Sequence, residues 1–355
     1  MIKIDRQYLL DSFLQIIKVP SPVGYYEQLN PMLEKMAGKL GYKVTYDNKR
    51  SAFIHIEGKN TDKNVVVCAH ADTLGLMVRS IEGDGKLKIR KLGGACLANM
   101  ENATVTVHTS EGKDYTGMLI CQSHSVHAFP NTHTLERNED TVRIILDEPV
   151  QSKADVLALG INVGDIVFVD PHTEYTKTGY LKSRFIDDKG GIACVFTMLK
   201  YLSDNNLKPD CNLTVALPYY EEIGMGATHV QTYSEATGCD CPAPCEMLAV
   251  DIGLIGPDLS GDERKVSICA KDAISPYDYQ FTSRLVSLAK KTGCDYVTDV
   301  YFSYSSDANA ALRAGNDFRI ANIGMAVYCS HGRERTHIDG LVNTTKLITA
   351  YVLNI

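Results

Sequence analysis

The chain has 355 residues, a formal net charge of −7 and a pI of about 5.8, with 45% hydrophobic and 22% charged residues. This composition is typical of a globular protein, and the length suggests two domains or one large one. The acidic balance and the absence of a Lys- or Arg-rich run argue against nucleic-acid binding. No apolar run approaches the roughly 18 residues of a membrane span, and the N-terminus lacks signal-peptide features. We therefore expect a cytoplasmic protein with no membrane partner.

The N-terminal part of the chain predicts alternating helices and strands. Apolar residues recur at helical spacing over 7–19 and 26–42, and Gly41 predicts the end of the second helix. The continuous apolar run at 64–70, NVVVCAH, is typical of a central strand covered on both faces.

From Thr73 to Lys177 the pattern changes to short segments rich in β-branched residues, separated by Gly, Asn and Asp. We predict an inserted β-rich domain at 73–177, within an α/β domain formed by 1–72 and 178–355. The expected strands of the insert are 86–92, 103–109, 141–146 and 164–170. Beyond the insert, helices are expected at 190–206, 281–293 and 341–355, and strands at 212–220 and 246–253.

Most of the eleven cysteines lie in apolar stretches and are expected to be small buried hydrophobes. Cys239, Cys241 and Cys245 cluster in CDCPAPC, and a metal-binding role for them stays open. A structural zinc site usually needs four ligands in recognised spacings, so reduced loop thiols are the favoured interpretation.

Acidic and imidazole side chains stand at five places where predicted strands end or loops begin. In open α/β sheets, sites form outside the carboxyl ends of the strands, so we expect these side chains to converge. A convergence of carboxylates is unstable without cations, which predicts two divalent metals. The candidates are His70 and Asp72, Asp187 and Asp188, Glu221 and Glu222, Asp251, and His337.

Glu221 and Glu222 are adjacent carboxylates at the end of a predicted buried strand. Neighbouring residues of an extended segment point to opposite sides, so one can bind metal while the other faces a metal-bound water. The pattern alone leaves open which residue takes which role.

Each candidate also fits a simpler role when it is taken alone. His70 fits a hydrogen-bonded core histidine, and Asp251 fits the start of a turn. Asp187 and Asp188 fit a helix N-cap, and the glutamate pair fits a solvated surface. The ordered combination favours a site, because each residue adjoins an apolar strand or a Gly-rich turn.

The order HADTLG, DDKGG, EEIG, VDIG and THIDG, with a β-rich insert between the first two, resembles the M42 metalloaminopeptidases. These are related to glutamyl and tetrahedral aminopeptidases, and some relatives carry an endoglucanase label. The resemblance covers essentially the whole chain. It implies an α/β domain with a mixed sheet, a barrel-like insert, and a cytoplasmic dinuclear-metal enzyme that removes the N-terminal residue of short peptides.

The resemblance also implies a role for each candidate. The implied metal ligands are His70 and Asp251 on one ion, Glu222 and His337 on the other, and Asp187 as the bridge. Glu221 is implied as the general base, and Asp72 as the partner of the other His70 nitrogen. The family often has Arg where Lys189 stands. Mixed histidine and carboxylate ligands suit zinc, cobalt or manganese, and zinc is the default.

The insert carries none of the implied ligands and is expected to have another use. Its strands at 103–109 and 141–146 would leave sheet edges that need cover. The resemblance implies that the insert mediates dimer contacts and that dimers assemble into a hollow dodecamer that admits short peptides.

Two other functions stay open at this stage. A glycoside hydrolase would need two carboxyls roughly 5–10 Å apart around a sugar and would favour aromatic platforms, yet the chain has no Trp. The other is a non-catalytic scaffold that kept the fold. His331, in SHGRERTH, could contact substrate or be an ordinary loop histidine.

Overall fold

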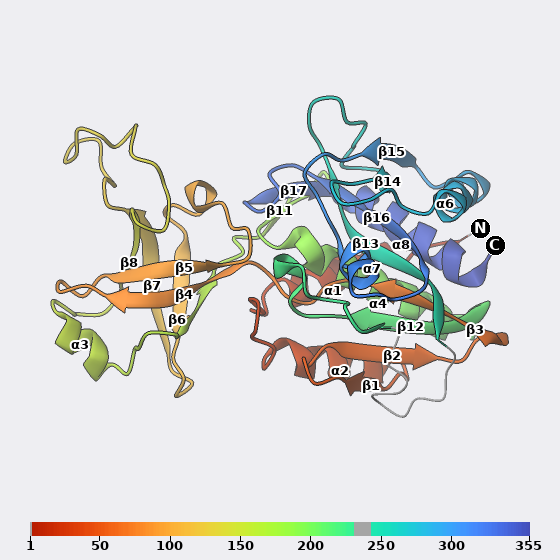
Figure 1. The fold of residues 1–355 in the computed structure, drawn as a ribbon, viewed down its shortest axis with the longest axis horizontal. Helices are drawn as coiled ribbons and strands as arrows, with labels where there is room; N and C mark the ends of the chain where they lie inside the picture. Colours follow the sequence, from red (N-terminus) through yellow and green to blue (C-terminus); the bar gives the residue numbers. More distant parts are fainter. Residues whose placement is uncertain (1, 231–242) are drawn as a thin grey trace.

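The computed structural model describes residues 2–230 and 243–355, which form an α/β domain and a β-barrel (Figure 1). The barrel lies on the left of Figure 1, and both chain termini lie at the opposite end of the molecule. The predicted fold class, a mixed-sheet α/β domain with an inserted barrel-like domain, is confirmed. Cys239 and Cys241 lie outside the described residues.

The α/β domain is built on an eight-stranded sheet with the order β1-β2-β12-β3-β13-β16-β14-β15. The four central strands are mutually parallel, whereas β2 and β14 run antiparallel to their inner neighbours. The carboxyl ends of the central strands therefore share one edge of the sheet. The strands are β1 (Val44–Tyr46), β2 (Ala52–Ile56), β3 (Asn60–Cys68), β12 (Cys211–Leu217), β13 (Pro244–Leu254), β14 (Val266–Lys271), β15 (Tyr296–Val300) and β16 (Arg319–Val327).

Helices cover this sheet and complete the core. The longest, α4, is buried on almost every side because it packs against α1, α8 and β13. The Asp5 carboxylate caps α1 by accepting a hydrogen bond from the Tyr8 N–H at 3.0 Å. In the parts of the chain that the structure describes, every helix is too short or too polar to span a bilayer. The helices are α1 (Arg6–Ile16), α2 (Leu29–Lys39), α4 (Ile186–Asp204), α6 (Tyr279–Thr292), α7 (Asp307–Arg313) and α8 (Ile338–Leu353).

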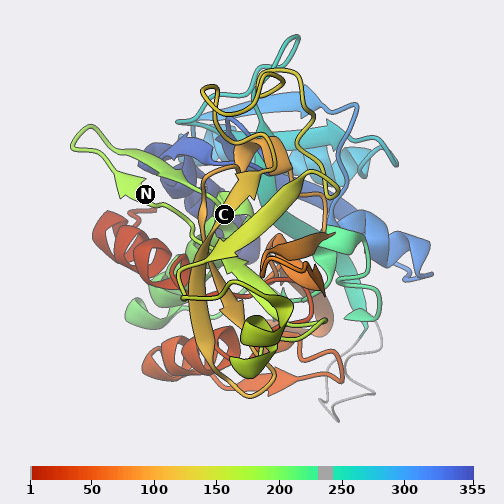
Figure 2. The same ribbon diagram turned by 90° about the vertical axis from the view of Figure 1, so that its left-hand side faces the viewer.

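The barrel closes in the order β4-β5-β8-β7-β6-β9, and Figure 2 looks onto it from its outer side. Fully buried Ile89, Val107 and Ile144 fill its interior. The expectation that these strands leave open edges is wrong, because each strand of a closed barrel is paired on both sides. The elements are β4 (Gly75–Ile81), β5 (Leu87–Leu92), β6 (Thr104–His108), β7 (Asp114–Cys121), β8 (Val142–Leu146), α3 (Lys153–Ala158) and β9 (Ile166–Val169).

A small three-stranded sheet lies between the barrel and the α/β domain (Figure 1). It contains β10 (Glu174–Tyr175), β11 (Tyr180–Ser183) and β17 (Glu334–His337). Strand β10 falls inside the segment 73–177 but is paired with β11, and β11 is paired with β17. The boundaries of the insert at 73 and 177 stay a prediction.

Candidate metal centre

The edge at which the parallel strands end holds a pocket of about 590 Å³. His70 stands just beyond β3, the glutamate pair lies beyond β12 in the short helix η2 (Glu221–Ile223), and Asp251 lies near the end of β13. Asp187 is the second residue of helix α4, which begins at Ile186. The carboxylate and histidine residues that line the pocket are Asp187, Glu221, Glu222, Asp251 and His331.

The buried His70 ring faces Asp187. Its Nδ1–H donates to the backbone carbonyl of Asp72 at 2.9 Å, so its Nε2 is left to face the pocket. Nε2 lies 2.9 Å from Oδ1 of Asp187 and 3.8 Å from Oε2 of Glu221. Burial lowers the pKa of His70, but the Glu221 and Asp187 carboxylates outweigh it and raise that pKa well above its usual value. This nitrogen is therefore placed where a cation is favoured.

His331 repeats this arrangement on the other oxygen of Asp187. Its Nδ1–H donates to the carbonyl of Gly94, in the loop after barrel strand β5, at 3.1 Å. Its Nε2 lies 3.7 Å from Oδ2 of Asp187 and 3.7 Å from Oε2 of Glu222. The ligand atoms of His70, Asp187 and Glu222 lie within 4.8 Å of one another, as those of a metal site can.

Three further carboxylates hold the backbone of these residues in place. Asp72 accepts hydrogen bonds from the N–H groups of Glu221 and Glu222, at 3.1 and 3.2 Å. Asp188 accepts from the His70 N–H at 3.1 Å, and Glu334 accepts from the Asp187 N–H at 3.1 Å. The sequence predicted that Asp72 holds the second nitrogen of His70; the atom closest to that nitrogen is the Asp72 carbonyl oxygen, because the carboxylate holds the glutamate turn instead.

Glu334 was not singled out from the sequence. Besides Asp187, it accepts from the backbone N–H of His331 at 3.3 Å, so one buried carboxylate fixes both residues. Glu334 lies three residues after His331 and between Arg333 and Arg335. Alternating charges of this kind are also found on exposed strands, so the sequence is only a weak indication that Glu334 is buried.

Left-handed backbone conformations help to orient the glutamate pair and His331. Tyr220, just before Glu221, has φ = 73°, and His331 has φ = 61°. Strained conformations cost residues other than glycine roughly 1–3 kcal/mol, and they cluster at functional sites. The turn at Tyr220 lets adjacent Glu221 and Glu222 both line the pocket, although they follow a strand.

His337 does not lie in this cluster. It is the N-cap of α8, where its Nδ1 accepts from the Asp339 N–H at 3.1 Å and its Nε2–H donates to the Thr178 carbonyl at 2.8 Å. Its ring also packs edge-on against Tyr180, with centroids 4.8 Å apart. Both nitrogens are used, so no lone pair remains for a metal, contrary to the expectation from the sequence.

The carboxylates of the pocket disfavour one another's charge. Burial raises the pKa of Asp251 to about 7, with Asp187 adding to the effect. Burial also raises the pKa values of Glu221 and Glu222 well above their usual range. Burial acts in the same direction on Asp187, but its hydrogen bond to His70 and the charge of that ring lower its pKa. The cluster binds protons tightly and is suited to exchange them for metal cations.

This cluster of histidines and carboxylates is of the kind that can bind divalent metals in a hydrolase. A sequence model of the M42 glutamyl aminopeptidase family matches residues 51–347. The chain belongs to the M42 peptidase family and is an aminopeptidase by class. The family expectation drawn from the motifs is confirmed.

Relatives of this chain carry aminopeptidase names. The putative aminopeptidase YhfE of Bacillus subtilis (strain 168) is 37% identical over 339 residues, which cover 95% of each chain. The glutamyl aminopeptidase of Lactococcus lactis subsp. cremoris is 24% identical over 226 residues, covering 63% of this chain and 62% of that protein.

Solved structures share the fold along the chain. Aminopeptidase APDkam598 of the archaeon Desulfurococcus kamchatkensis superposes with a TM-score of 0.86 at 20% identity, over 99% of this chain and 96% of that one. The TET1 peptidase of Pyrococcus horikoshii, which can assemble into a tetrahedron or a large octahedral shell, gives 0.80 at 20% identity, over 98% and 100%. A Thermotoga maritima protein named endoglucanase gives 0.72 at 15% identity, over 96% of each chain. At these identities the likeness shows the fold alone.

Proposed function

We propose that the protein is a dinuclear-metal aminopeptidase that removes the N-terminal residue from short peptides. The observation that carries the two-metal site is the position of Asp187 between two histidines. Its Oδ1 lies 2.9 Å from Nε2 of His70, and its Oδ2 lies 3.7 Å from Nε2 of His331. A carboxylate with each oxygen directed at a different imidazole has the geometry of a bridge between two ions.

In this proposal His331 replaces His337 as a ligand. The two ligand sets share Asp187 and are His70 with Asp251 for one ion and Glu222 with His331 for the other. Each imidazole donates Nδ1–H to a backbone carbonyl, which orients Nε2 and increases its basicity. The 3.7 Å between His331 and Glu222 is close to the about 3.3 Å that separates two ligands of a tetrahedral zinc.

Glu221 fits the role of general base. Metals held by the two ligand sets would polarise the scissile carbonyl and lower the pKa of the attacking water. Glu221 lines the same pocket, and its Oε2 lies 3.8 Å from Nε2 of His70, beyond direct hydrogen-bonding distance. It accepts one proton as the water attacks the carbonyl carbon and transfers it to the amine that leaves when the C–N bond breaks. Burial raises the pKa of Glu221 in the metal-free protein.

The residues of the pocket also indicate which metal it suits and which of the competing functions they favour. Zinc remains the default over cobalt or manganese, since the donors are imidazole and carboxylate. A glycosidase needs two carboxyls separated by a sugar, whereas here Asp187 and Glu222 are grouped with His70 within 4.8 Å. The site contains the residues that the proposal assigns as metal ligands and as general base, which supports an enzyme over a non-catalytic scaffold.

We further propose that the chain forms a homo-oligomer, most simply a dimer-based dodecamer. Met118 of β7 and Ile145 of β8 are cross-strand partners, and both are exposed on the outside of the barrel, by 42% and 39%. An apolar outer face on the insert suits contact with a second copy. Light scattering that gives a mass near the 39.1 kDa of one chain, with metals bound, would contradict this. A dimer would keep the role of the barrel and exclude the shell. A cytoplasmic location stays a prediction.

The function is tested by removing and restoring metal. Protein treated with a chelator and reloaded with zinc, cobalt or manganese is assayed on short peptides with free or acetylated N-termini. We expect two metal equivalents per chain, activity that follows metal content, and cleavage of the free peptides alone. Hydrolysis of a β-glucan that survives the chelator would favour the glycosidase instead.

A further inference from the structure

Beyond the metal-binding residues the wall of the pocket is uncharged, and five of its residues form an apolar part, called the apolar wall below. Besides the carboxylates and His331, its side chains are hydrocarbon or carry a hydroxyl group, and no Lys or Arg lines it among the described residues. The apolar residues are Ile252, Leu254, Ala273, Ile274 and Phe302. The strand that supplies Asp251 also supplies Ile252 and Leu254, so this wall starts directly beside the proposed reaction centre.

The loop that carries Ile274 is fixed before any substrate binds. The fully buried Asp272 carboxylate accepts hydrogen bonds from the N–H groups of Ile274 and Ser275, at 2.8 and 3.0 Å, and from the Tyr277 hydroxyl at 2.7 Å. The Ala273 N–H donates to the Tyr304 carbonyl at 3.1 Å, which ties this loop to the one that carries Phe302. A wall held in this way is preformed, as ligand pockets usually are.

Two of these residues leave apolar surface in water. Phe302 is 88% exposed and Ile274 is 47% exposed, at the rim of the same pocket. Single exposed apolar residues are common, but several around one concave site indicate what the site binds. An apolar side chain bound in this pocket would remove part of this surface from water.

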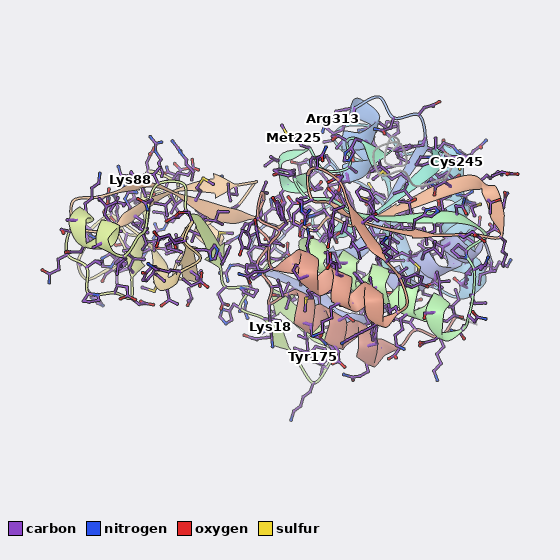
Figure 3. All side chains as sticks on the ribbon, turned by 90° about the horizontal axis from the view of Figure 1, so that it is seen from below. Lys18, Lys88, Tyr175, Met225, Cys245 and Arg313 are labelled. Carbon is purple, nitrogen blue, oxygen red and sulfur yellow. The ribbon has the colours of Figure 1, made fainter. Side chains whose placement is uncertain are left out.

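The charged groups near the pocket do not favour a charged side chain. A lysyl side chain would need a free carboxylate, but the proposal assigns Asp187, Glu222 and Asp251 to metals and Glu221 to proton transfer. A glutamyl side chain would need a cation, since an unpaired buried charge is costly. One candidate is the exposed Arg313, whose Nη2 lies 3.5 Å from where a Cβ on Gly224 would be. Figure 3 shows Arg313 near Met225 on the α/β domain, and Arg313 does not line the pocket.

We infer that this enzyme selects peptides whose N-terminal residue is apolar, such as leucine, methionine or phenylalanine, over those that begin with glutamate or lysine. The inference rests on the proposed function and names its substrate class. The apolar wall receives the side chain of that first residue, while the metal-binding edge receives the peptide bond that follows it.

The test is a panel of aminoacyl-p-nitroanilides with the metal-loaded protein. We expect kcat/KM for leucyl, methionyl and phenylalanyl substrates to exceed that for glutamyl and lysyl substrates by about 10- to 100-fold. A preference for glutamyl or lysyl substrates would overturn the inference and leave the proposed function intact. No hydrolysis of any substrate by protein with both metals bound would overturn both.

Matched variants locate the preference in the wall. Ile274→Arg adds a cation to the pocket and should raise the glutamyl-to-leucyl ratio about tenfold. Ile355→Arg makes the same change at a similarly exposed residue (43%) at the far end of the α/β domain and should leave the ratio unchanged. Arg313→Ala should also leave it unchanged; a fall in glutamyl hydrolysis there would show that Arg313 selects acidic residues and would contradict the inference.

A second variant removes an apolar side chain from the wall instead of adding a charge. Phe302→Ala should lower kcat/KM about tenfold for leucyl and phenylalanyl substrates, but less than about twofold for the alanyl substrate, whose methyl group reaches less of the wall. Because Phe302 is largely exposed, the fold does not depend on it. An equal loss for all substrates would argue against a side-chain pocket at this place.

Discussion

The barrel and the edge of the α/β sheet bury very different side chains. Ile89, Val107 and Ile144 fill the barrel, so its stability comes from apolar surface removed from water. The sheet edge instead buries carboxylates whose charges oppose one another, which is costly until a cation or a proton neutralises them. The difference indicates where each kind of change should act: we expect changes at the edge to alter chemistry and metal content, and changes in the barrel interior to alter stability.

The largest expected effect is at the edge and is purely chemical. Glu221→Gln keeps the size of the side chain but cannot accept a proton. We expect kcat to fall by roughly 10²–10⁴ or more, with both metals retained. The adjacent control, Glu222→Gln, should lose metal as well as activity. Near-normal turnover in Glu221→Gln would remove its role as base, and loss of metal in that variant would exchange the roles of the two glutamates.

The next effect separates two histidines six positions apart. His331→Ala should lose one metal and most of the activity, because its Nε2 faces Asp187 and Glu222. His337→Ala should keep both metals and lose only about 0.5–2 kcal/mol of stability, as for a lost N-cap. Metal analysis and thermal unfolding measure these outcomes. Metal loss from His337→Ala with full occupancy in His331→Ala would restore the assignment made from the sequence.

The bridge can be tested in the same assay. Asp187→Ala removes an anion that faces both histidines, so the affinity for both metals should fall together. Two full metal equivalents in this variant would exclude the bridging role. Asp188→Ala is the neighbouring comparison, because Asp188 accepts a hydrogen bond from the backbone of His70 and lies behind the cluster.

Gly94 belongs to the insert, but a change there should act on the metal-binding edge. A Cβ on Gly94 would lie 2.9 Å from Nδ1 of His331, so Gly94→Ala should displace that ring and weaken one metal site about 10- to 100-fold. Gly83→Ala, where a Cβ would meet no atom within 4 Å, is the matched control in the insert. Titration with zinc or manganese distinguishes them. Equal metal affinity in the two variants would show that the barrel does not position His331.

The smallest effect is on the pH dependence of stability. Burial raises the pKa of Asp251 to about 7 from an ordinary value of 3.8. Between these pH values the folded metal-free protein binds more protons than the unfolded chain, so its stability falls as the pH rises. Metal displaces those protons, so the increase in Tm on adding metal should be larger at pH 8 than at pH 5.5. An increase that is the same at both pH values would mean that Asp251 does not exchange a proton for metal.

Much of the site was accessible from the sequence because of a property of parallel sheets. His70, Glu221 and Asp251 each follow or end an apolar strand, and the carboxyl ends of such strands meet at one edge whatever the details of packing. The insert was also evident from its change in composition, since β-branched residues at short spacing predict strands. Composition alone did not indicate that the barrel closes, because closure depends on how the first and last strands pair; only the resemblance implied a barrel-like insert.

Only the tertiary structure could decide between His331 and His337. Both lie in one short polar stretch, and nothing local distinguishes them. Pairing of β17 with β11 directs His337 towards Thr178 and the start of α8. The carbonyl of Gly94, more than two hundred residues earlier in the chain, accepts from His331 and directs its other nitrogen into the pocket. The sequence alone predicted which residue types the proposed metal centre needs. Contacts between distant segments determined which histidine faces the pocket, because a ring's hydrogen-bond partners set the nitrogen that remains free.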